Sequence, residues 1–392
     1  MFHLHRKRES DAEAEQRDSL RAQRELLAFG TLSVNTDDEK LTESESWWSQ
    51  RFEWLKNNGY LLRPRYAPNW VPSWHGTKMD MFSCEDSSIP KAATRILDGT
   101  RISDGVFVVF KIVKRSEYPY EVDIARFFST DPIRSDPANH CVPIYDVLPL
   151  PGDADTVLIV MPLLREYKAP PFCTVGEAVD CFRQLFAGLQ FMHKHRVAHR
   201  DCMSMNIMMD ASRLYVDAFH PVHPLMRRDF SRFARYKTRT QRSVRYLFID
   251  FGLSRQYDSS IIKPLEYPIW GGDKEVPEFH RSDEPCDPFP TDVFYIGNAI
   301  RKDFIQPKHG FEFMEPLIAD MINEDPSKRP TMNEVVARFE AIQKTLDSWK
   351  LRSRVVDRYE TLLEVTTRTA LHWTRQLTYV VRRLPAVPPQ LS

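Results

Sequence analysis

Two short stretches of the sequence, AHRDCMSMN (198–206) and FIDFGLS (248–254), decide how the rest of the chain is interpreted. In the first, Asp201 precedes Asn206 by five positions, and in the second, Asp250 follows an apolar run typical of a buried strand. Mg²⁺ prefers oxygen ligands from carboxylates and amides, so Asn206 and Asp250 are candidate metal ligands. Asp201 is then a carboxylate beside a metal site, where it can act as a general base.

These two motifs resemble the catalytic core of eukaryotic-type protein kinases, which carry HRD, an Asn five residues after its Asp, and DFG downstream. The resemblance implies a two-lobed α+β fold with a small, mostly β N-lobe and a large, mostly α C-lobe. It also implies that ATP and Mg²⁺ are the cofactors, that Asp201 orients or deprotonates a hydroxyl, and that Asn206 and Asp250 hold the metal. Either motif alone recurs by chance, whereas both in order, each after an apolar strand, are specific.

A lysine upstream fits the same pattern. The apolar run VFVVFKIV (106–113) contains Lys111 and resembles the family strand whose lysine holds the α- and β-phosphates. In the family this lysine pairs with a Glu on the next helix, and Glu121 in EVDIARFF is the expected partner, with Glu117 as the alternative. Because only ten residues separate Lys111 from Glu121, we expect the helix to be truncated at its start. A solvated surface Glu is the other interpretation of Glu121.

The stretch TVLIVMPLLREY (156–167) is expected to form a buried strand that runs into the hinge between the lobes. The resemblance places Met161 at the back of the nucleotide pocket and Pro162, Leu163 and Leu164 in the hinge. There the adenine would meet backbone N–H and C=O groups. A core strand without a ligand is the alternative, and Met161 is expected to be buried under both interpretations.

Three motifs downstream also fit the family. VPE (276–278) resembles the APE that ends the activation segment, Asp292 resembles the buried Asp that hydrogen-bonds the HRD backbone, and Arg329 resembles the partner of the APE Glu. They are typical of protein kinases and not of small-molecule phosphotransferases with a similar HxDxxxxN. Because a buried carboxylate without its cation is costly, Glu278 and Arg329 are expected to pair.

Three departures from the family pattern bear on activity. No GxGxxG precedes Lys111, so the phosphate-covering loop is expected to come from SCEDSSIPKAA (83–93), which has no glycine to adopt positive φ angles freely. Met203 stands where serine/threonine kinases carry a lysine that steadies the transferring phosphate, and the loss of a cation there weakens transition-state stabilisation. The segment WGGDKE (270–275) lacks the Thr expected in the substrate platform.

Two functions from different classes follow. The first is an active protein kinase that transfers the ATP γ-phosphate to a protein hydroxyl, Ser or Thr in preference to Tyr. The second is a pseudokinase, a signalling or scaffolding module with weak or no transfer, and the three departures support it. The first is favoured because Lys111, Glu121, Asp201, Asn206 and Asp250 are all present. A domain relieved of catalysis has little physical reason to keep two carboxylates that face each other.

A regulatory hypothesis concerns Arg200, which directly precedes Asp201. In the family such an arginine commonly receives a phosphate on the activation segment. A phosphate on Ser259 or Ser260 would gain charge-assisted hydrogen bonds from Arg200. The alternative is that Arg200 only hydrogen-bonds nearby backbone carbonyls, and both interpretations stay open at this point.

Composition fits one catalytic domain with extensions. The 392 residues are 42% hydrophobic, enough for a sizeable core, and Lys plus Arg equals Asp plus Glu at 54 each. Net charge therefore predicts no bulk attraction to nucleic acid or membrane. No apolar run approaches the roughly 18 residues of a membrane helix, and the N-terminus lacks the apolar part of a signal peptide. The six cysteines show no metal-ligand spacing and are expected to be reduced. We expect a cytoplasmic protein, with the nucleus as the second location.

The motifs divide the chain into five parts. These are a charged segment that is disordered or a solvated helix (1–41), a helix and an aromatic, proline-rich strap (42–75), the N-lobe and hinge (76–164), the C-lobe with a basic insertion near 211–245 (165–346), and a basic amphipathic extension (347–392). The strap sequence GYLLRPRYAPNWVPSW (59–74) is expected to be extended, without regular hydrogen bonds. It resembles a segment that precedes the catalytic domain in an expanded kinase-like family of mushroom-forming fungi. Packing against the lobes is favoured for it over peptide binding.

Three capping boxes predict helix starts, at Thr42/Glu45, Thr174/Glu177 and Thr331/Glu334. After each box, apolar residues recur at helical spacing and predict a buried face. These residues are Trp48, Phe52 and Leu55 in the first helix, Phe182, Leu185, Leu189 and Met192 in the central helix, and Val335, Val336, Phe339 and Ile342 in the closing helix.

Two basic segments suggest partners. Residues 227–245 hold seven Arg and one Lys against one Asp, with aromatic residues between them. Such a patch suits a phosphorylated or acidic protein, with nucleic acid as the less favoured ligand, and a solvated loop is the alternative. Residues 351–384 are basic and amphipathic, and docking on their own chain is favoured over a partner. The apolar residues expected to dock are Val355, Tyr359, Leu362, Trp373, Leu377 and Val380.

Overall fold

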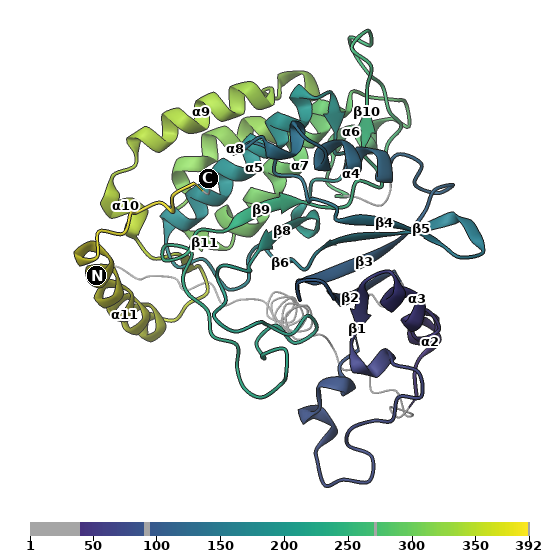
Figure 1. The fold of residues 1–392 in the computed structure, drawn as a ribbon. Helices are drawn as coiled ribbons and strands as arrows, with labels where there is room; N and C mark the ends of the chain where they lie inside the picture. The colour runs from purple at the N-terminus through teal and green to yellow at the C-terminus, as the bar shows by residue number, and fades with distance from the viewer. Residues whose placement is uncertain (1–39, 90–94, 270–272, 391–392) are drawn as a thin grey trace, which may run out of the picture. The chain divides into compact units, whose positions relative to one another are not determined.

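The structure is a computed structural model that describes residues 40–89, 95–269 and 273–390. The fold is mixed α+β (Figure 1), as expected at that level. Two compact units make up the chain. The first comprises the described residues up to Val108 together with Asp217–Arg235, and the second comprises Val109–Val216 and Tyr236 onward. In the described residues, no helix has the length and apolarity to cross a membrane. Most of the predicted charged N-terminal segment lies outside the described residues.

The first unit is built from two short helices and a pair of strands. They are α2 (Glu43–Ser49), α3 (Phe52–Asn57), β1 (Tyr60–Leu62) and β2 (Ile96–Arg101). The capping box of Thr42 and Glu45 is confirmed at the start of α2. Trp48, Phe52 and Leu55 are buried, as their spacing predicted. The chain leaves the helical conformation between α2 and α3, so the predicted helix is two helices that bury a common face.

The expectation of an extended strap at 59–74 is wrong for its first half. Tyr60–Leu62 forms β1, which pairs antiparallel with β2 in the register Tyr60 to Arg101 and Leu62 to Gly99. Tyr60 and Leu62 are buried whereas Leu61 is exposed, a period of two that identifies a strand. Pro64–Tyr66 then forms a 3₁₀ turn. The prolines that follow obscured this short alternation in the sequence.

This strand also corrects the origin of the loop before β2. The connection between β1 and β2 covers residues 63–95 and not only 83–93. It contains 3₁₀ turns at Met81–Ser83 and Glu85–Ser87 and one glycine, Gly76, at φ 67°. Residues 90–94 of the connection lie outside the described residues. The departure from a short glycine-rich turn is therefore larger than the sequence suggested.

The second unit contains the remaining strands and helices, and the boundary between the units falls within β3. The strands are β3 (Phe107–Lys114), β4 (Asp146–Leu150), β5 (Asp153–Pro162), β6 (Arg165–Glu166), β7 (Val197–Ala198), β8 (Ile207–Asp210), β9 (Arg245–Phe248), β10 (Arg255–Gln256), β11 (Lys308–His309) and β12 (Val356–Asp357). The sheet order places β3 beside β5 and β5 beside β4. Among the described residues, three smaller sheets have the orders β6-β8-β9, β10-β7 and β11-β12.

The second unit also contains the remaining helices. They are α4 (Glu121–Ser129), α5 (Val175–Lys194), α6 (Pro277–Arg281), α7 (Pro288–Ile300), a π-helical turn (Arg301–Ile305), α8 (Glu315–Met321), α9 (Met332–Thr345), α10 (Ser348–Arg352) and α11 (Leu362–Val381). α5 packs against α9 and α10, and α8 lies against both α7 and α9 (Figure 1). The predicted inward face of α5 is confirmed, since Phe182, Leu185, Leu189 and Met192 are buried.

The predicted caps of α5 and α9 have different outcomes. The capping box of Thr331 and Glu334 is present at α9. At α5, only one of the two hydrogen bonds of the predicted capping box is present. Thr174 Oγ1 accepts from Glu177 N at 3.1 Å, as predicted. The Glu177 carboxylate, however, accepts through Oε2 from the backbone N–H of Cys173 and not from that of Thr174. Thr240 donates to Glu177 Oε1. Glu177 therefore joins two segments of the unit instead of closing its own helix end.

Candidate active site

The loop between β7 and β8 carries Asp201 and Asn206, and a buried carboxylate on α7 holds its backbone. Asp292, fully buried, accepts from His199 N at 2.8 Å and from Arg200 N at 2.7 Å. The predicted contact of Asp292 with the HRD backbone is thus present. His199 Nε2 donates to the carbonyl of Ile249, at 3.1 Å. These contacts join the two sequence motifs across the β7–β8 region and fix the direction of the Asp201 side chain.

Two residues of the site have left-handed backbone conformations. Arg200 has φ 67° and Asp250 has φ 65°, a region that residues other than glycine rarely occupy. Such residues cost on the order of 1 to 3 kcal/mol each and concentrate at functional sites. Both flank the candidate chemistry directly, because one precedes Asp201 and the other is the candidate metal ligand. Two of the six described non-glycine residues with positive φ therefore lie beside the candidate chemistry.

Asp201 is an incompletely satisfied carboxylate. Asn206 Nδ2 donates to its Oδ2 at 2.7 Å and to its carbonyl at 2.8 Å, whereas Oδ1 is buried with no hydrogen-bond partner among the described residues. Burial raises the pKa of Asp201 to about 7, and Asp250 adds to the effect while Asn206 opposes it. A carboxylate with a pKa near neutrality can hold or release a proton under physiological conditions.

Lys111, Glu121 and Asp250 form a second cluster in the same unit. Lys111 Nζ lies 2.5 Å from Glu121 Oε1 and 2.8 Å from Asp250 Oδ1. The predicted ion pair of Lys111 with Glu121 is present, and Glu121 is the first residue of α4, so the helix is short at its start as expected. Burial raises the pKa of Glu121. Burial acts against the charge of Lys111, but the two carboxylates outweigh it and raise the lysine pKa.

Gly252 allows this cluster to close. A Cβ added at Gly252 would lie 2.9 Å from the Tyr118 ring, 3.2 Å from Asp250 Oδ1 and 3.3 Å from Glu121 Oε2. Any side chain would therefore displace the Tyr118 ring and crowd both carboxylates. The backbone N–H of Gly252 also donates to Asp250 Oδ1. Although burial acts in the opposite direction, Lys111 and this hydrogen bond lower the pKa of Asp250, so Asp250 is held ionised.

The proposed adenine contacts lie at and just beyond the end of β5. Met161 is half-buried and not fully buried as expected, because its side chain lies at the edge of a cluster with Val113, Val157 and Ile159. Leu163 is half-buried and Leu164 is buried. Partly exposed apolar side chains therefore lie beside a core strand. This arrangement is expected both for the wall of a ligand pocket and for the edge of a strand without a ligand.

The segment that follows Asp250 is fixed at its far end. Glu278 and Arg329 form the expected pair, with Oε2 to Nη2 at 2.6 Å, and Thr291 donates to Glu278 Oε1 at 2.8 Å. Arg329 and Glu278 lower the energetic cost of each other's burial. Of the predicted substrate platform, residues 270–272 lie outside the described residues. The described part is held by Lys302, whose Nζ lies 3.2 Å from Asp273.

One anchoring residue had no sequence signal. Asp303, in the π-helical turn after α7, accepts from Ser204 and Tyr167 at 2.5 Å each and from Lys168 Nζ at 2.8 Å. Ser204 belongs to the loop between Asp201 and Asn206, so Asp303 positions that loop from about one hundred residues away in sequence. π-helical turns are frequent at functional sites, but no periodicity in the sequence identifies one.

The basic insertion is mostly engaged within its own units. In the first unit, Arg228 lies 2.7 Å from Asp98 and Arg235 lies 2.8 Å from Asp217. In the second, Arg239 is buried and donates to the carbonyl of Tyr167. Arg228 and Arg239 fit neither a solvated loop nor a fully available basic patch, whereas the Arg235 side chain is 63% exposed. Any partner of this insertion would have to use the cations that remain exposed.

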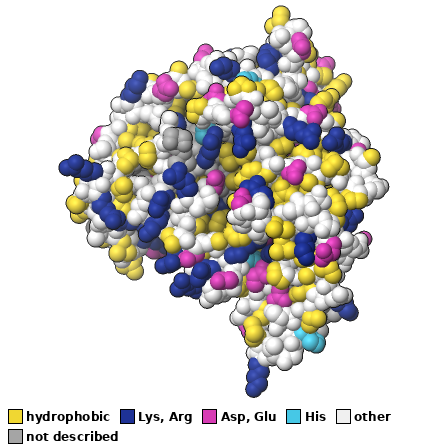
Figure 2. All heavy atoms as spheres, viewed as in Figure 1, with side chains coloured by type: hydrophobic (Ala, Val, Ile, Leu, Met, Phe, Trp, Pro, Cys, Tyr) yellow, Lys and Arg dark blue, Asp and Glu magenta, His cyan; other side chains and the backbone are white. Residues whose placement is uncertain are grey.

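The C-terminal extension packs on its own unit, but through another face than predicted. His372, Gln376 and Tyr379 are the buried residues of α11, and His372 Nε2 donates to the carbonyl of Arg352 at 2.8 Å. The expectation that the apolar residues dock is wrong for Tyr359, Leu362, Leu377 and Val380, which are exposed. Figure 2 shows hydrophobic side chains mixed with Lys and Arg over α10 and α11. The buried face of α11 is therefore partly polar, which the hydrophobic pattern did not predict.

No family model matches the chain, and no curated protein matches it. The site is therefore interpreted from its own geometry.

Proposed function

We propose that the chain is a protein kinase of the eukaryotic type with the two-lobed fold of that class, similar to the kinase-like family of mushroom-forming fungi. It would transfer the ATP γ-phosphate to a protein hydroxyl, on Ser or Thr in preference to Tyr. The observation that carries the proposal is Asp201: a carboxylate with a pKa of about 7 and a buried Oδ1 that has no hydrogen-bond partner among the described residues. It lies in one compact unit with the cluster of Lys111, Glu121 and Asp250.

The donor set suits Mg²⁺ and nucleotide phosphates. Asn206 directs its Nδ2 to Asp201, which leaves its amide oxygen for a metal, and Asp250 is ionised with a half-exposed side chain. Hard oxygen donors are what Mg²⁺ prefers. MgATP, when bound, supplies the phosphoryl group. Lys111, aligned by Glu121, would hold phosphate oxygens, and Asp250 would exchange its contact with Lys111 for the metal.

The chain's own residues would perform the proton chemistry. Asn206 orients the Asp201 carboxylate, so Oδ1 can accept the hydrogen bond of an incoming hydroxyl. As the hydroxyl oxygen becomes a nucleophile, its proton moves to Asp201. A base whose pKa lies near the working pH accepts a proton efficiently. Asp292 and Asp303 keep the loop still during this step. Positioning and charge stabilisation account for most of the rate in this class of reaction.

A pseudokinase is the second candidate, and one contact favours it. Lys111 bonds directly to Asp250 at 2.8 Å, so the phosphate-binding cation and a metal-binding carboxylate satisfy each other. With Met203 in place of a lysine and a long β1–β2 connection, this pairing would suit a scaffold that does not bind nucleotide. The protein would then present its surfaces to a signalling partner.

Nucleotide binding separates the two candidates. Thermal denaturation of the purified chain with millimolar MgATP should show stabilisation, about 1.4 kcal/mol at a concentration ten times Kd, and Asp250→Asn should reduce it. Lys114→Met, an exposed lysine at the end of the same strand as Lys111, is the matched control and should respond as the wild type does. No shift for the wild-type chain at millimolar MgATP would favour the pseudokinase.

A further inference from the structure

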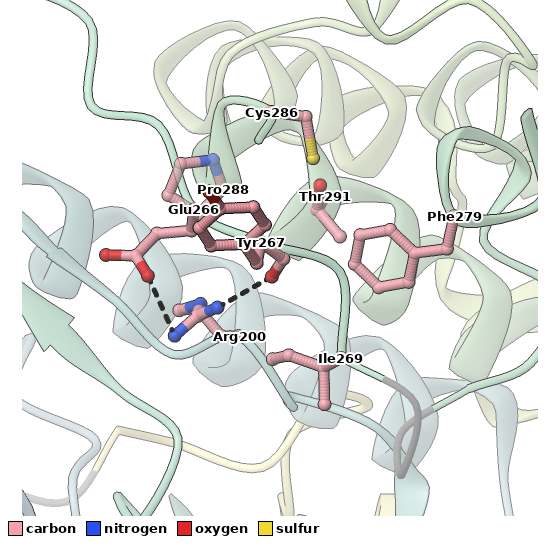
Figure 3. Close-up of a pocket in the computed structure, with 8 residues that line it drawn as sticks. All are labelled: Arg200, Glu266, Tyr267, Ile269, Phe279, Cys286, Pro288 and Thr291. Atoms are coloured by element: carbon pink, nitrogen blue, oxygen red, sulfur yellow. Dashed lines mark hydrogen bonds and ion pairs between the residues drawn. The ribbon is translucent and has the colours of Figure 1, made fainter. Parts of the chain in front are cut away.

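Arg200 is a buried cation, and its guanidinium contacts Leu253, Glu266 and Tyr267, which belong to the segment after Asp250. Its Nη1 donates to the carbonyl of Leu253 at 3.1 Å, and its Nη2 donates to the carbonyl of Tyr267 at 3.0 Å. Glu266 Oε2 lies 3.2 Å from Nη1 (Figure 3). The Arg200 side chain is only 8% exposed, and an uncompensated charge at such a site is strongly destabilising. Glu266 is therefore the counter-charge that this arginine requires.

Glu266 is itself held on three sides. The Tyr257 hydroxyl donates to its Oε1 at 3.0 Å, so each carboxylate oxygen has a different partner. Its backbone exchanges two hydrogen bonds with Cys286, each 2.9 Å long, just before α7 begins at Pro288. Glu266 thus joins the loop of Asp201, the strand region near β10 and the start of α7. Figure 3 shows its carboxylate directed at the Arg200 guanidinium.

The enclosed space beside the Arg200 guanidinium is small. The cavity beside Arg200 is lined by Glu266, Tyr267, Ile269, Phe279, Cys286, Pro288 and Thr291, and has a volume of about 10 Å³, roughly the space of one water molecule. Ser260, one of the two candidate phosphorylation sites, bonds instead to Asp258, through its N–H at 2.8 Å and its hydroxyl at 2.7 Å. Arg196 holds the same turn by donating to the carbonyl of Ile261.

We infer that Glu266 is a positioning residue: a fixed carboxylate that holds segment 253–269 against the Asp201 loop without any covalently added phosphate. The sequence left two kinds of partner open for Arg200: a phosphate or backbone carbonyls. Its guanidinium bonds to backbone carbonyls, and it also pairs with the Glu266 carboxylate, which the sequence did not predict. The consequence for activity rests on the proposed function, because Glu266 acts on Asp201 through Arg200. The consequence for the order of the segment does not depend on catalysis.

Hydrogen exchange tests the order of the segment directly. The full-length chain is treated with a phosphatase, and its amide exchange is compared with that of untreated protein and of Glu266→Ala and Glu266→Gln. We expect no effect of the phosphatase. In Glu266→Ala, exchange at the amides of Glu266 and Cys286 should be faster by about tenfold or more, as expected for loss of a charge-assisted contact, and Glu266→Gln should lie between. Glu284→Gln, an exposed carboxylate nearby, is the control and should match the wild type.

Kinetics add a readout that a merely structural role would not move. Under the proposed function, Glu266→Ala lowers kcat about tenfold with KM for ATP unchanged, because the nucleotide contacts lie elsewhere. Unchanged exchange in Glu266→Ala, or faster exchange after phosphatase treatment of the wild type, would overturn the inference. If the wild-type chain shows no phosphate transfer, the proposed function fails while the exchange results still decide the role of Glu266.

Discussion

The two units each contain a cluster of buried charge, and the clusters differ in how completely their atoms are satisfied. In the first unit, Arg65 bonds to both oxygens of Glu45, at 2.5 and 3.2 Å, and to the carbonyl of Asp86. In the second, Asp201 and Glu121 each have a buried oxygen without a partner among the described residues. Saturated charges hold a fold together, whereas buried carboxylates with an unsatisfied oxygen are candidates for binding a ligand. The contrast separates structural from functional charge without reference to any relative.

The largest expected effect is on phosphate transfer. Lys111→Met and Asp250→Asn should each abolish transfer, a loss of at least about a thousandfold when a preorganised charge at the reacting centre is removed. The melting temperature should change little, because Glu121 can take up a proton when Lys111 is lost. Transfer of labelled γ-phosphate and thermal denaturation measure the two quantities. Lys114→Met should retain full activity, and turnover in both site variants would remove the assignment.

The structural cluster should respond in the opposite way. Arg65→Met leaves Glu45 as an uncompensated buried charge and should cost roughly 3 to 5 kcal/mol of unfolding free energy. The double variant Arg65→Met with Glu45→Leu should cost less than Arg65→Met alone. Urea denaturation measures both values. Lys56→Met, which breaks the exposed pair with Glu53, should change stability by less than about 1 kcal/mol; equal effects for Arg65 and Lys56 would contradict the distinction.

The pKa of Asp201 predicts a pH dependence of transfer. Since burial raises that pKa to about 7, the carboxylate is protonated below pH 7 and cannot accept the hydroxyl proton. The rate of transfer at saturating MgATP should rise about tenfold per pH unit below 7 and level off above it. A rate that is flat between pH 5.5 and 8 would show that Asp201 is not the titrating base.

The final expected effect is the pH dependence of stability. Asp201 has a folded pKa above its unfolded value, so its contribution to stability is present below the unfolded pKa near 4 and is lost as pH rises through about 7. Because Asn does not titrate, Asp201→Asn should not lose stability in this way as the pH rises. The variant should therefore melt higher than the wild type at pH 8, with a smaller difference at pH 5. A difference that is larger at pH 5 would reverse the sign and contradict the raised pKa.

The parts of the site that the sequence predicted depend on local spacing. Lys111 lies on an apolar strand and Glu121 opens the next helix, so a ten-residue gap already limits their separation. The position of Asp292 followed from a similar short motif. Long-range anchors gave no such signal: Glu266 and Asp303 are ordinary surface-type residues in the sequence, and only the packing of distant segments brings them to Arg200 and Ser204.

The errors in the fold also have physical causes. β1 is three residues long and directly precedes a proline-rich run. The prolines led to the prediction of an extended strap, although the first residues alternate between buried and exposed as in a strand. On α11, the hydrophobic pattern predicted the wrong buried face: the face that docks carries His372 and Tyr379, which hydrogen-bond to Arg352 O and to the Thr238 hydroxyl. In both places a few specific contacts decided the outcome against an average preference.

The central claim is that Asp201 serves catalysis, and transfer from labelled MgATP to protein Ser or Thr tests it most directly. The wild-type chain and Asp201→Asn are compared at pH 8, with phosphoamino-acid analysis of the products. We predict incorporation on Ser or Thr by the wild type and a rate lower by about 10² to 10⁴ for Asp201→Asn, whose fold is intact by thermal denaturation. Equal rates for the two proteins, or no incorporation by either while MgATP binds, would contradict the account.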